Sequence, residues 1–148
     1  MNTLYLLVGL QASGKSTLAQ SLKDNNTIVL SSEAIRYELL GDEKDQSNNR
    51  LVFSTLYARA KELLKTKNVI IDATNINREM RALCLAPFKD MKIKRVAIVI
   101  DTPLEVCIER DSKRQRVVGR DVIIQYANMY EQPELEEGFD EIIYKKVI

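Results

Sequence analysis

Short apolar runs recur along the chain and are separated by longer stretches of mixed character. Each run is uninterrupted, and this composition is typical of strands in a parallel sheet, because helices cover both faces of such strands. We therefore predict strands at residues 4–8, 27–30, 69–72, 96–100 and 142–144.

The stretches between these runs carry apolar residues three and four positions apart, which predicts amphipathic helices. The helices are expected at residues 16–22, 33–40, 51–67, 78–91, 103–110 and 121–130, with an acidic loop at 133–140. Pro87 is expected to kink or split the fourth helix, and Pro103 to take the first helical position of the fifth. The predicted capping residues are Ser31 or Ser32 for the second helix, Asn75 or Asn77 for the fourth, and Asp121 for the sixth.

Strands that alternate with helices predict an α/β fold, here a doubly wound, mainly parallel sheet flanked by helices on both faces. The 148 residues are the size of one domain with a proper core. The sequence shows no repeats, low-complexity tracts or linkers. We therefore expect residues 1–148 to form a single domain.

The first predicted strand and helix flank the segment 9–17, which matches the phosphate-binding pattern G-x-x-x-x-G-K-[ST]. In such a loop, backbone N–H groups and the N-terminus of the following helix surround the phosphates of a nucleotide. Lys15 is expected to reach the β- and γ-phosphates, and Ser16 to bind Mg²⁺. The alternative is a glycine-containing turn beside a solvated lysine. The candidate residues for binding ATP or another NTP are Gly9, Gln11, Ala12, Ser13, Gly14, Lys15, Ser16 and Thr17.

Asp72 ends the third predicted strand. In a parallel sheet, ligands gather at the carboxyl ends of the strands, and an acid beside a phosphate loop commonly holds Mg²⁺, often through water. The alternative is that Asp72 only caps a loop. We expect Asp72 and Ser16 to form the metal site.

Glu33 and Arg36 stand three positions apart on the second predicted helix and therefore share one face. Glu33 can deprotonate an attacking hydroxyl, and the guanidinium of Arg36 can hold a phosphate of the acceptor through two hydrogen bonds. The alternative is an exposed ion pair that contributes only about a few tenths of a kcal/mol.

Basic residues dominate the segment 110–120, although the net charge of the chain is only +1. Phosphoryl transfer spreads negative charge over the γ-phosphate oxygens, and arginines that a lid brings over them stabilise this charge. Gly119 is the candidate hinge. The alternative is a solvated basic turn, and spacing does not decide which arginine acts. The candidate lid arginines are Arg110, Arg114 and Arg116.

The sequence contains no histidine, which excludes mechanisms that need a histidine base or zinc ligand. Cys84 and Cys107 lack metal-ligand spacing, so we expect buried thiols in a reducing cytosol. Tyr126 and Tyr130 are expected to pack in the core or against another subunit rather than to stack on bases. No apolar run is long enough to span a membrane, and Met1 leads almost directly into the first strand. We therefore expect a cytoplasmic protein without a leader or membrane segment.

Four segments together carry a resemblance to a known family: the loop at 9–17, Ser31-Ser32-Glu33-Ala34-Ile35-Arg36, Asp72-Ala73-Thr74-Asn75 with Arg78 and Arg81, and Glu109-Arg110-Asp111-Ser112-Lys113-Arg114. The chain resembles the P-loop 5′-hydroxyl polynucleotide kinases, which include the kinase module of phage and bacterial end-healing enzymes. The resemblance covers nearly the whole chain. The Asp-x-Thr-Asn run of the third segment and the lid run are more specific than the loop, which many NTPases share.

The resemblance implies a role for each matched residue. Glu33 would be the general base, although the family usually has an aspartate there, one methylene shorter. Arg36 would hold the acceptor phosphate next to the reacting 5′-hydroxyl, and Asp72 a metal-bound water. Arg114, together with Arg110, would contact the γ-phosphate, while Lys15 and Ser16 would bind the phosphates of ATP and Mg²⁺.

We thus expect an ATP-dependent kinase that phosphorylates the 5′-hydroxyl end of RNA or DNA. One alternative is a kinase for a small-molecule hydroxyl on a nucleoside, sugar or antibiotic. Another is a nucleotide-dependent switch that transfers nothing. The sequence leaves open RNA against DNA, the base of the phosphate donor, and the oligomeric state.

Overall fold

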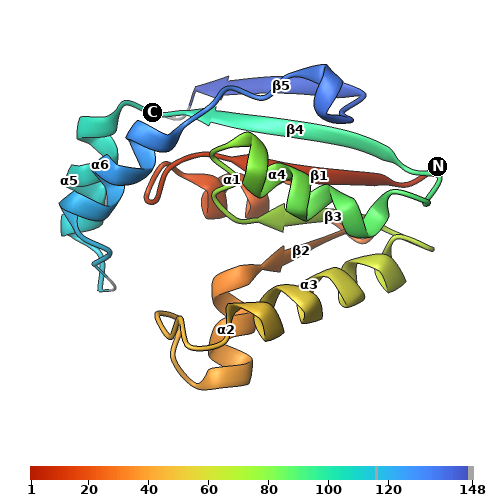
Figure 1. The fold of residues 1–148 in the computed structure, drawn as a ribbon, viewed down its shortest axis with the longest axis horizontal. Coiled ribbons are helices and arrows are strands. Elements are labelled where there is room, and N and C mark those ends of the chain that lie inside the picture. Colours follow the sequence, from red (N-terminus) through yellow and green to blue (C-terminus); the bar gives the residue numbers. More distant parts are fainter. Residues whose placement is uncertain (116, 147–148) are drawn as a thin grey trace.

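The computed structural model describes residues 1–115 and 117–146. Five parallel strands form one sheet in the order β2-β3-β1-β4-β5 (Figure 1). The predicted parallel α/β sheet is confirmed, and each predicted strand is present. The strands are β1 (Thr3–Val8), β2 (Thr27–Ser31), β3 (Asn68–Asp72), β4 (Lys94–Asp101) and β5 (Glu141–Lys146).

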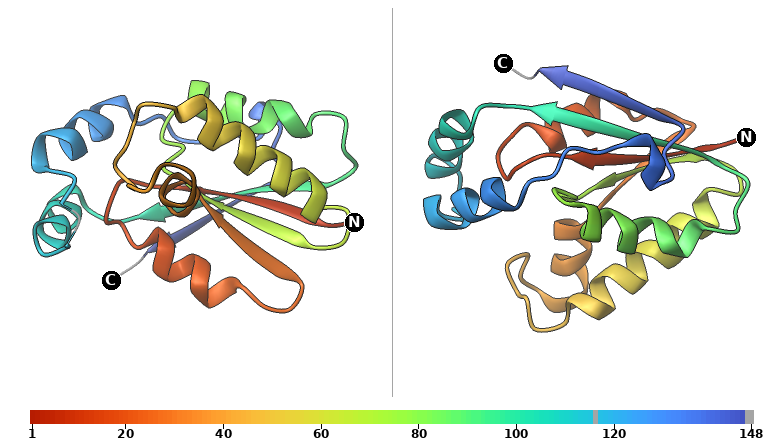
Figure 2. Two further views of the ribbon diagram at one scale, coloured as in Figure 1. Left: turned by 90° about the horizontal axis from the view of Figure 1, so that it is seen from below. Right: turned by 45° about the horizontal axis from the view of Figure 1, so that its top comes forward.

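Helices cover both faces of this sheet, as a doubly wound fold requires (Figure 2). Helix α1 lies against one face, and α3 and α4 lie against the other. Helices α5 and α6 lie beyond the carboxyl ends of the strands, where the predicted arginine-bearing lid is found (Figure 1). In residues 1–115 and 117–146, no helix is both long and apolar enough to cross a membrane. The helices are α1 (Lys15–Leu22), α2 (Ser32–Leu40), α3 (Asn49–Leu63), α4 (Arg78–Leu85), α5 (Leu104–Ser112) and α6 (Arg120–Met129).

Capping contacts decide between the alternatives that the sequence left open. The side chain of Ser31 accepts the N–H of Ala34 and caps α2, and the side chain of Asn77 accepts the N–H of Met80 and caps α4. The expectation that Asp121 caps α6 is wrong, because Gly119 is the capping residue and Asp121 lies inside the first turn.

Pro87 and Pro103 lie at helix ends, at or within one residue of the predicted positions. Helix α4 ends at Leu85 and a single 3₁₀ turn, η1 (Ala86–Phe88), carries Pro87, so the predicted split is confirmed. Pro103 is the capping residue of α5 rather than its first helical residue, a shift of one position. A second short turn, η2 (Leu135–Glu137), lies within the acidic loop.

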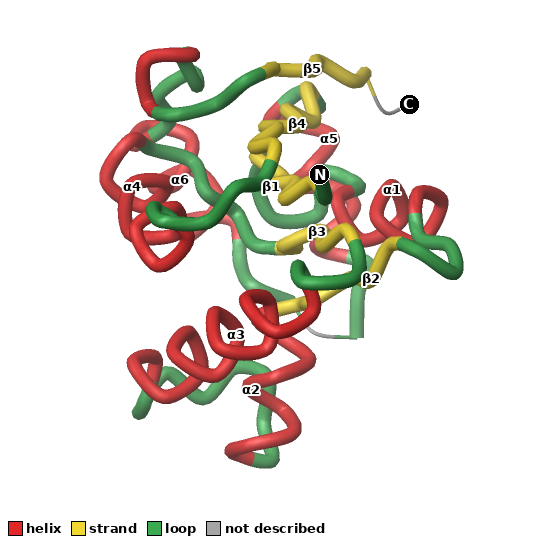
Figure 3. The backbone as a smooth tube through the Cα atoms, turned by 90° about the vertical axis from the view of Figure 1, so that its right-hand side faces the viewer, coloured by secondary structure: helices red, strands yellow, loops and turns green. Residues whose placement is uncertain are grey.

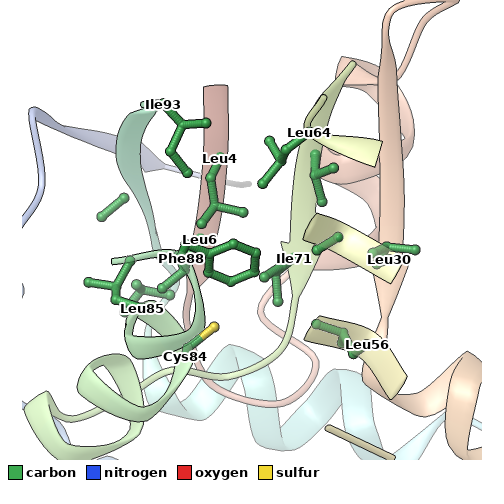
Figure 4. Close-up of a cluster of buried hydrophobic side chains, with 14 of the residues drawn as sticks. Leu4, Leu6, Leu30, Leu56, Leu64, Ile71, Cys84, Leu85, Phe88 and Ile93 are labelled. Atoms are coloured by element: carbon green, nitrogen blue, oxygen red, sulfur yellow. The ribbon is translucent and has the colours of Figure 1, made fainter. Parts of the chain in front are cut away.

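The larger part of the core lies between the sheet and helices α3 and α4 (Figure 4). Leu4 and Leu6 of β1 point toward Phe88, which is fully buried. Truncating one such leucine to alanine costs about 2–5 kcal/mol. Cys84 is buried in this cluster, which confirms the expected buried thiol at this position, and burial raises the pKa of the thiol to about 12.

Strand register brings three loops together at one edge of the sheet. In the β2–β3 pair Ser31 lies opposite Asp72, and in the β1–β3 pair Leu6 lies opposite Ile71. The residues that follow β1, β2 and β3 therefore meet at the carboxyl ends of the strands, the end of the sheet beyond which α5 and α6 lie (Figure 1). Figure 3, which looks along the strands, shows α1 on the side of the sheet away from α3 and α4.

Candidate functional site

The loop between β1 and α1 has the backbone that its sequence requires. A Cβ on Gly9 would lie 2.8 Å from Ser13 Oγ and 3.4 Å from the carbonyl oxygen of Ile100, so a side chain at this position would require Ser13 to move. Gly14 has a φ of 108°, and Ala12 takes a φ of 60°, a conformation that also favours glycine. The loop thus folds tightly in front of the N-terminus of α1, which is a ready site for an anion.

Two buried polar atoms in this loop lack partners. In the part of the chain that the structure describes, Ser13 Oγ and Gln11 Oε1 form no hydrogen bond. An unpaired buried polar group costs about 1–3 kcal/mol, so such atoms mark places that a ligand can satisfy. Thr17, the last residue of the motif, lies in the first turn of α1 and is exposed.

Lys15 lies buried under the loop and donates hydrogen bonds from Nζ to the carbonyl oxygens of Gly9 (3.1 Å) and Leu10 (2.7 Å). Burial lowers the pKa of this amine to about 8. The negative charges of Asp72 and Glu33 oppose that shift, and the positive charge of Arg114 adds to it. Electrostatic coupling therefore links all of these side chains to the same amine.

Ser16 and Asp72 are joined directly, since Ser16 Oγ donates to Asp72 Oδ2 over 2.8 Å. A serine hydroxyl and a carboxylate are oxygen ligands that suit Mg²⁺, which completes its octahedral shell with water and substrate phosphates. Residues 1–115 and 117–146 contain no cluster of three or more acidic, cysteine or histidine ligands. The residues present therefore fit a magnesium ion that is shared with a nucleotide.

The loop after Asp72 is tied to the phosphate loop by contacts that the sequence did not predict. The N–H of Gly9 donates to the carbonyl oxygen of Thr74 (2.9 Å), and Asn75 Nδ2 donates to the carbonyl oxygen of Leu7 (3.3 Å). Asn75 has a φ of 46°, which places its side chain back toward β1. These bonds fix the loop that follows Asp72 against the phosphate loop.

Glu33 and Arg36 lie on α2, at the β2 side of the phosphate loop. Glu33 is half-buried in the first turn of α2. Arg36 is 6% exposed, and its Nη2 donates to Asn49 Oδ1 over 3.0 Å. The alternative of an exposed ion pair is therefore wrong for Arg36. Within the described residues its Nε is buried and forms no hydrogen bond.

The lid arginines reach the phosphate loop from the opposite side. Arg110 Nη1 donates to the carbonyl oxygen of Ser13 over 3.4 Å, and Arg114 lies close enough for its charge to lower the pKa of Lys15. Arg116 lies outside the described residues. Asp111, between the two arginines in sequence, is buried and was not a candidate from the sequence.

Arg78 and Arg81, quoted for the resemblance, lie elsewhere. Arg81 is fully buried and forms two hydrogen bonds with Glu137, at 2.7 and 3.3 Å, while its Nη1 donates to the carbonyl oxygen of Asn75. Arg78 pairs at the surface with Glu136. Both arginines bind the acidic loop to α4 rather than contact the phosphate loop.

A cavity of about 310 Å³ opens beside the start of the phosphate loop. It is lined by Leu10, by the end of β4 and by two aromatic residues, Tyr130 and Tyr144. The expectation of core packing is wrong for Tyr130, because this residue follows α6, lines the cavity and is 37% exposed, whereas packing against another subunit stays a prediction. Burial on its inner side still raises the pKa of its hydroxyl.

Comparison with known proteins shows which family the chain matches. The model of a protein family described as "AAA domain" matches residues 4–133. Protein Kti12 of Schizosaccharomyces pombe is 25% identical over 146 residues, which cover 88% of this chain and 52% of that protein. The chain thus spans about half the length of this curated relative.

Solved structures share the fold. Kti12 of Chaetomium thermophilum, in complex with ADP-AlF3, superimposes with a TM-score of 0.75 at 18% identity, over 97% of this chain and 88% of that one. APS kinase CysC of Mycobacterium tuberculosis, in complex with AMPPNP and APS, gives 0.70 at 24% identity, over 97% and 88%. A chain of the Pnkp1/Rnl/Hen1 RNA repair complex gives 0.74 at 26% identity, over 86% and 43%.

Proposed function

The chain belongs to the AAA domain family and is a P-loop kinase-like nucleotide-binding domain, and from this premise we propose that it transfers the γ-phosphate of ATP, or of another NTP, to a 5′-hydroxyl end of RNA or DNA. We propose further that residues 1–148 act as one domain in this reaction.

The observation that carries the proposal is that acidic and basic side chains from different elements meet at the phosphate loop. Asp72 accepts a hydrogen bond from Ser16 over 2.8 Å, and Arg110 donates to the carbonyl oxygen of Ser13 over 3.4 Å. Glu33 follows two residues after Ser31, which lies opposite Asp72 in the sheet. In the proposed complex, the terminal phosphate of the nucleotide lies between the carboxylate of Glu33 and the arginines of α5 and the residues that follow it. That arrangement suits in-line transfer to a hydroxyl.

In the proposed reaction, Glu33 accepts the proton of the acceptor hydroxyl, whose oxygen then forms a bond to the γ-phosphorus as the bond to the β-phosphate oxygen breaks. Lys15, Arg110 and Arg114 stabilise the charge on the phosphate oxygens. Mg²⁺, held by Ser16 and Asp72, would supply further neutralisation of the β- and γ-phosphates.

Arg36 supports a polynucleotide as the acceptor. Its guanidinium is oriented by Asn49 and buried, with Nε left unpartnered among the described residues. A phosphodiester next to the reacting hydroxyl would satisfy that donor through a charge-assisted hydrogen bond. The 26% identity to a chain of an RNA repair complex favours the same substrate class.

The test is transfer of label from γ-labelled ATP to 5′-hydroxyl oligonucleotides of RNA and of DNA. We expect Lys15→Ala to abolish transfer and Glu33→Ala to lower it by about 100-fold or more. Glu38→Ala is the matched control, because Glu38 lies on the same helix and pairs at the surface with Arg59. Normal transfer by Glu33→Ala, or no transfer by the wild type to any oligonucleotide, would contradict the proposal.

A second candidate acceptor is a small alcohol. Lys44, in the loop between α2 and α3, donates from Nζ to the carbonyl oxygen of Val117 over 3.3 Å, so this loop contacts the segment that precedes α6. The fold is shared with APS kinase. The same assay with nucleosides, sugars and other small alcohols separates the two candidates, since only one acceptor class should be labelled.

A further inference from the structure

Asp111 fastens both ends of the turn that joins α5 to α6. Its carboxylate accepts the N–H of Val118 at Oδ1 (3.0 Å) and the N–H of Gly119 at Oδ2 (2.9 Å). Its backbone carbonyl oxygen accepts the N–H of Arg114 (3.1 Å). One residue, 1% exposed, thus binds the chain just after α5 and again just before α6.

Burying the carboxylate of Asp111 in this turn has a cost in desolvation free energy. Removing an ionised group from water costs several kcal/mol unless hydrogen bonds replace the lost hydration, as the two N–H donors do here. A neutral side chain would avoid this cost of burial. We therefore infer that Asp111 serves to keep the backbone of Val118 and Gly119 in one conformation.

The side chain that depends on this shape is that of Arg114. Its Nη1 forms an ion pair with Asp111 Oδ1 at 3.9 Å, which is too long for a hydrogen bond, and its side chain is 30% exposed. The two carboxylate oxygens are occupied by backbone donors, so Asp111 fixes the turn without a hydrogen bond to the guanidinium. The charge of Arg114 still acts on Lys15 in the phosphate loop.

We propose that Asp111 is a positioning residue, which binds Val118 and Gly119 to the end of α5 and thereby presents Arg114 to the transferring phosphate. The proposal rests on the phosphoryl-transfer function proposed above. A preformed turn avoids the cost of ordering the arginine during the reaction, and a displacement of about 1 Å at such a group can cost about 100-fold in rate.

The test compares binding of ADP with binding of ADP plus aluminium fluoride, a mimic of the transferring phosphoryl group. We expect Asp111→Asn to weaken the aluminium fluoride complex by about 10- to 100-fold, because an amide can accept only one of the two N–H groups, and to leave ADP affinity within about twofold. The matched control is Asp121→Asn, an exposed aspartate in the first turn of α6, which should change neither affinity.

A double-mutant cycle shows whether Asp111 acts through Arg114. We expect Arg114→Ala to weaken the aluminium fluoride complex strongly, and Asp111→Asn to add nothing in that background. Additive effects, or an equal loss of ADP affinity, would reduce Asp111 to a structural cap and overturn the proposal.

A measurement on the unchanged protein guards against a variant that does not fold. By hydrogen exchange, the amides of Val118 and Gly119 should exchange at least about tenfold more slowly than in an unstructured peptide. Fast exchange at both amides would overturn the proposal without any substitution. Because these readouts require no acceptor, failure to phosphorylate oligonucleotides would contradict the proposed function and leave the result on Asp111 intact.

Discussion

Ala12 carries a side chain at a backbone position that favours glycine, with a φ of 60°. The left-handed region costs a residue with a Cβ about 1–2 kcal/mol, whereas glycine loses about 0.5–1 kcal/mol of chain entropy. We therefore expect Ala12→Gly to raise the free energy of unfolding by about 0.5 kcal/mol, measured by urea denaturation.

The control for Ala12 is the same substitution at a position of ordinary conformation. Ala58→Gly on the exposed side of α3 should lower the free energy of unfolding by about 1 kcal/mol. A loss of stability at both positions would show that Ala12 is not strained.

Lys15 should make nucleotide affinity depend on pH. Burial lowers its pKa to about 8, and only the protonated amine attracts phosphate, so the bound nucleotide raises that pKa. We expect the Kd for ADP, measured by calorimetry, to be constant from about pH 6.5 to about pH 7.5 and to rise above about pH 8 by up to about tenfold per pH unit.

Few other groups can produce this pH dependence. The chain has no histidine, and burial raises the pKa of the Cys107 thiol. Lys15→Arg keeps a cation whose pKa lies far higher, so its Kd should be flat over the same range, even if binding is weaker. A flat profile in the wild type would contradict the lowered pKa.

At this scale, the sequence predicted the residues whose chemistry depends on a local pattern. Lys15 and Ser16 lie at the start of α1 because the motif places them there, whereas Arg110 reaches the loop from α5. Asn49 and Asp111 could not be predicted as candidates from the sequence. Their hydrogen bonds, to Arg36 and to the N–H of Val118, depend on how the chain folds and not on the residue type.

At the scale of elements, helix α4 is bound to the acidic loop by two arginines in very different surroundings. The guanidinium of Arg81 is fully buried against Glu137, whose side chain is 6% exposed, whereas Arg78 is 42% exposed. Removing one partner of a buried pair leaves the other charge uncompensated. We expect Arg81→Met to lower the free energy of unfolding by about 3–5 kcal/mol in denaturant titrations.

The neighbouring pair provides the comparison. Arg78→Met should change stability by less than about 1 kcal/mol, because exposed ion pairs are screened by water. If Arg81→Met does not fold, the double variant Arg81→Met with Glu137→Met should recover stability, since neither charge is then buried alone. Similar small losses for Arg81 and Arg78 would contradict the buried pair.

The element pattern predicted each strand and helix but not every boundary. Helix α6 begins at Arg120, because Gly119 with a φ of 108° can turn the chain there and Asp111 binds its N–H. Asp121 looked like a capping residue on local grounds, but the tertiary contact determines the start. The end of α4 near Pro87 could be predicted from the sequence, because proline lacks the N–H that a helix needs for its next hydrogen bond.

At the scale of the whole molecule, alternation of strands and helices predicted the parallel sheet and its two covered faces. It could not predict the order β2-β3-β1-β4-β5, because strand order depends on which crossover each helix makes. The meeting of Glu33, Asp72 and Lys15 follows from that order. The sequence therefore predicted the participants in the candidate site but not their separations.

The pairing of β2 with β3 has one consequence for how the molecule can change over evolutionary time. Ser31 lies opposite Asp72, and Glu33 follows two residues later, so the sheet itself sets the spacing between Glu33, the proposed base, and Asp72, the proposed metal ligand. The exposed stretch between α2 and α3 plays no part in that spacing. The length and composition of this stretch can therefore change during evolution. Such changes could alter which acceptor binds and leave the proposed phosphoryl transfer unchanged.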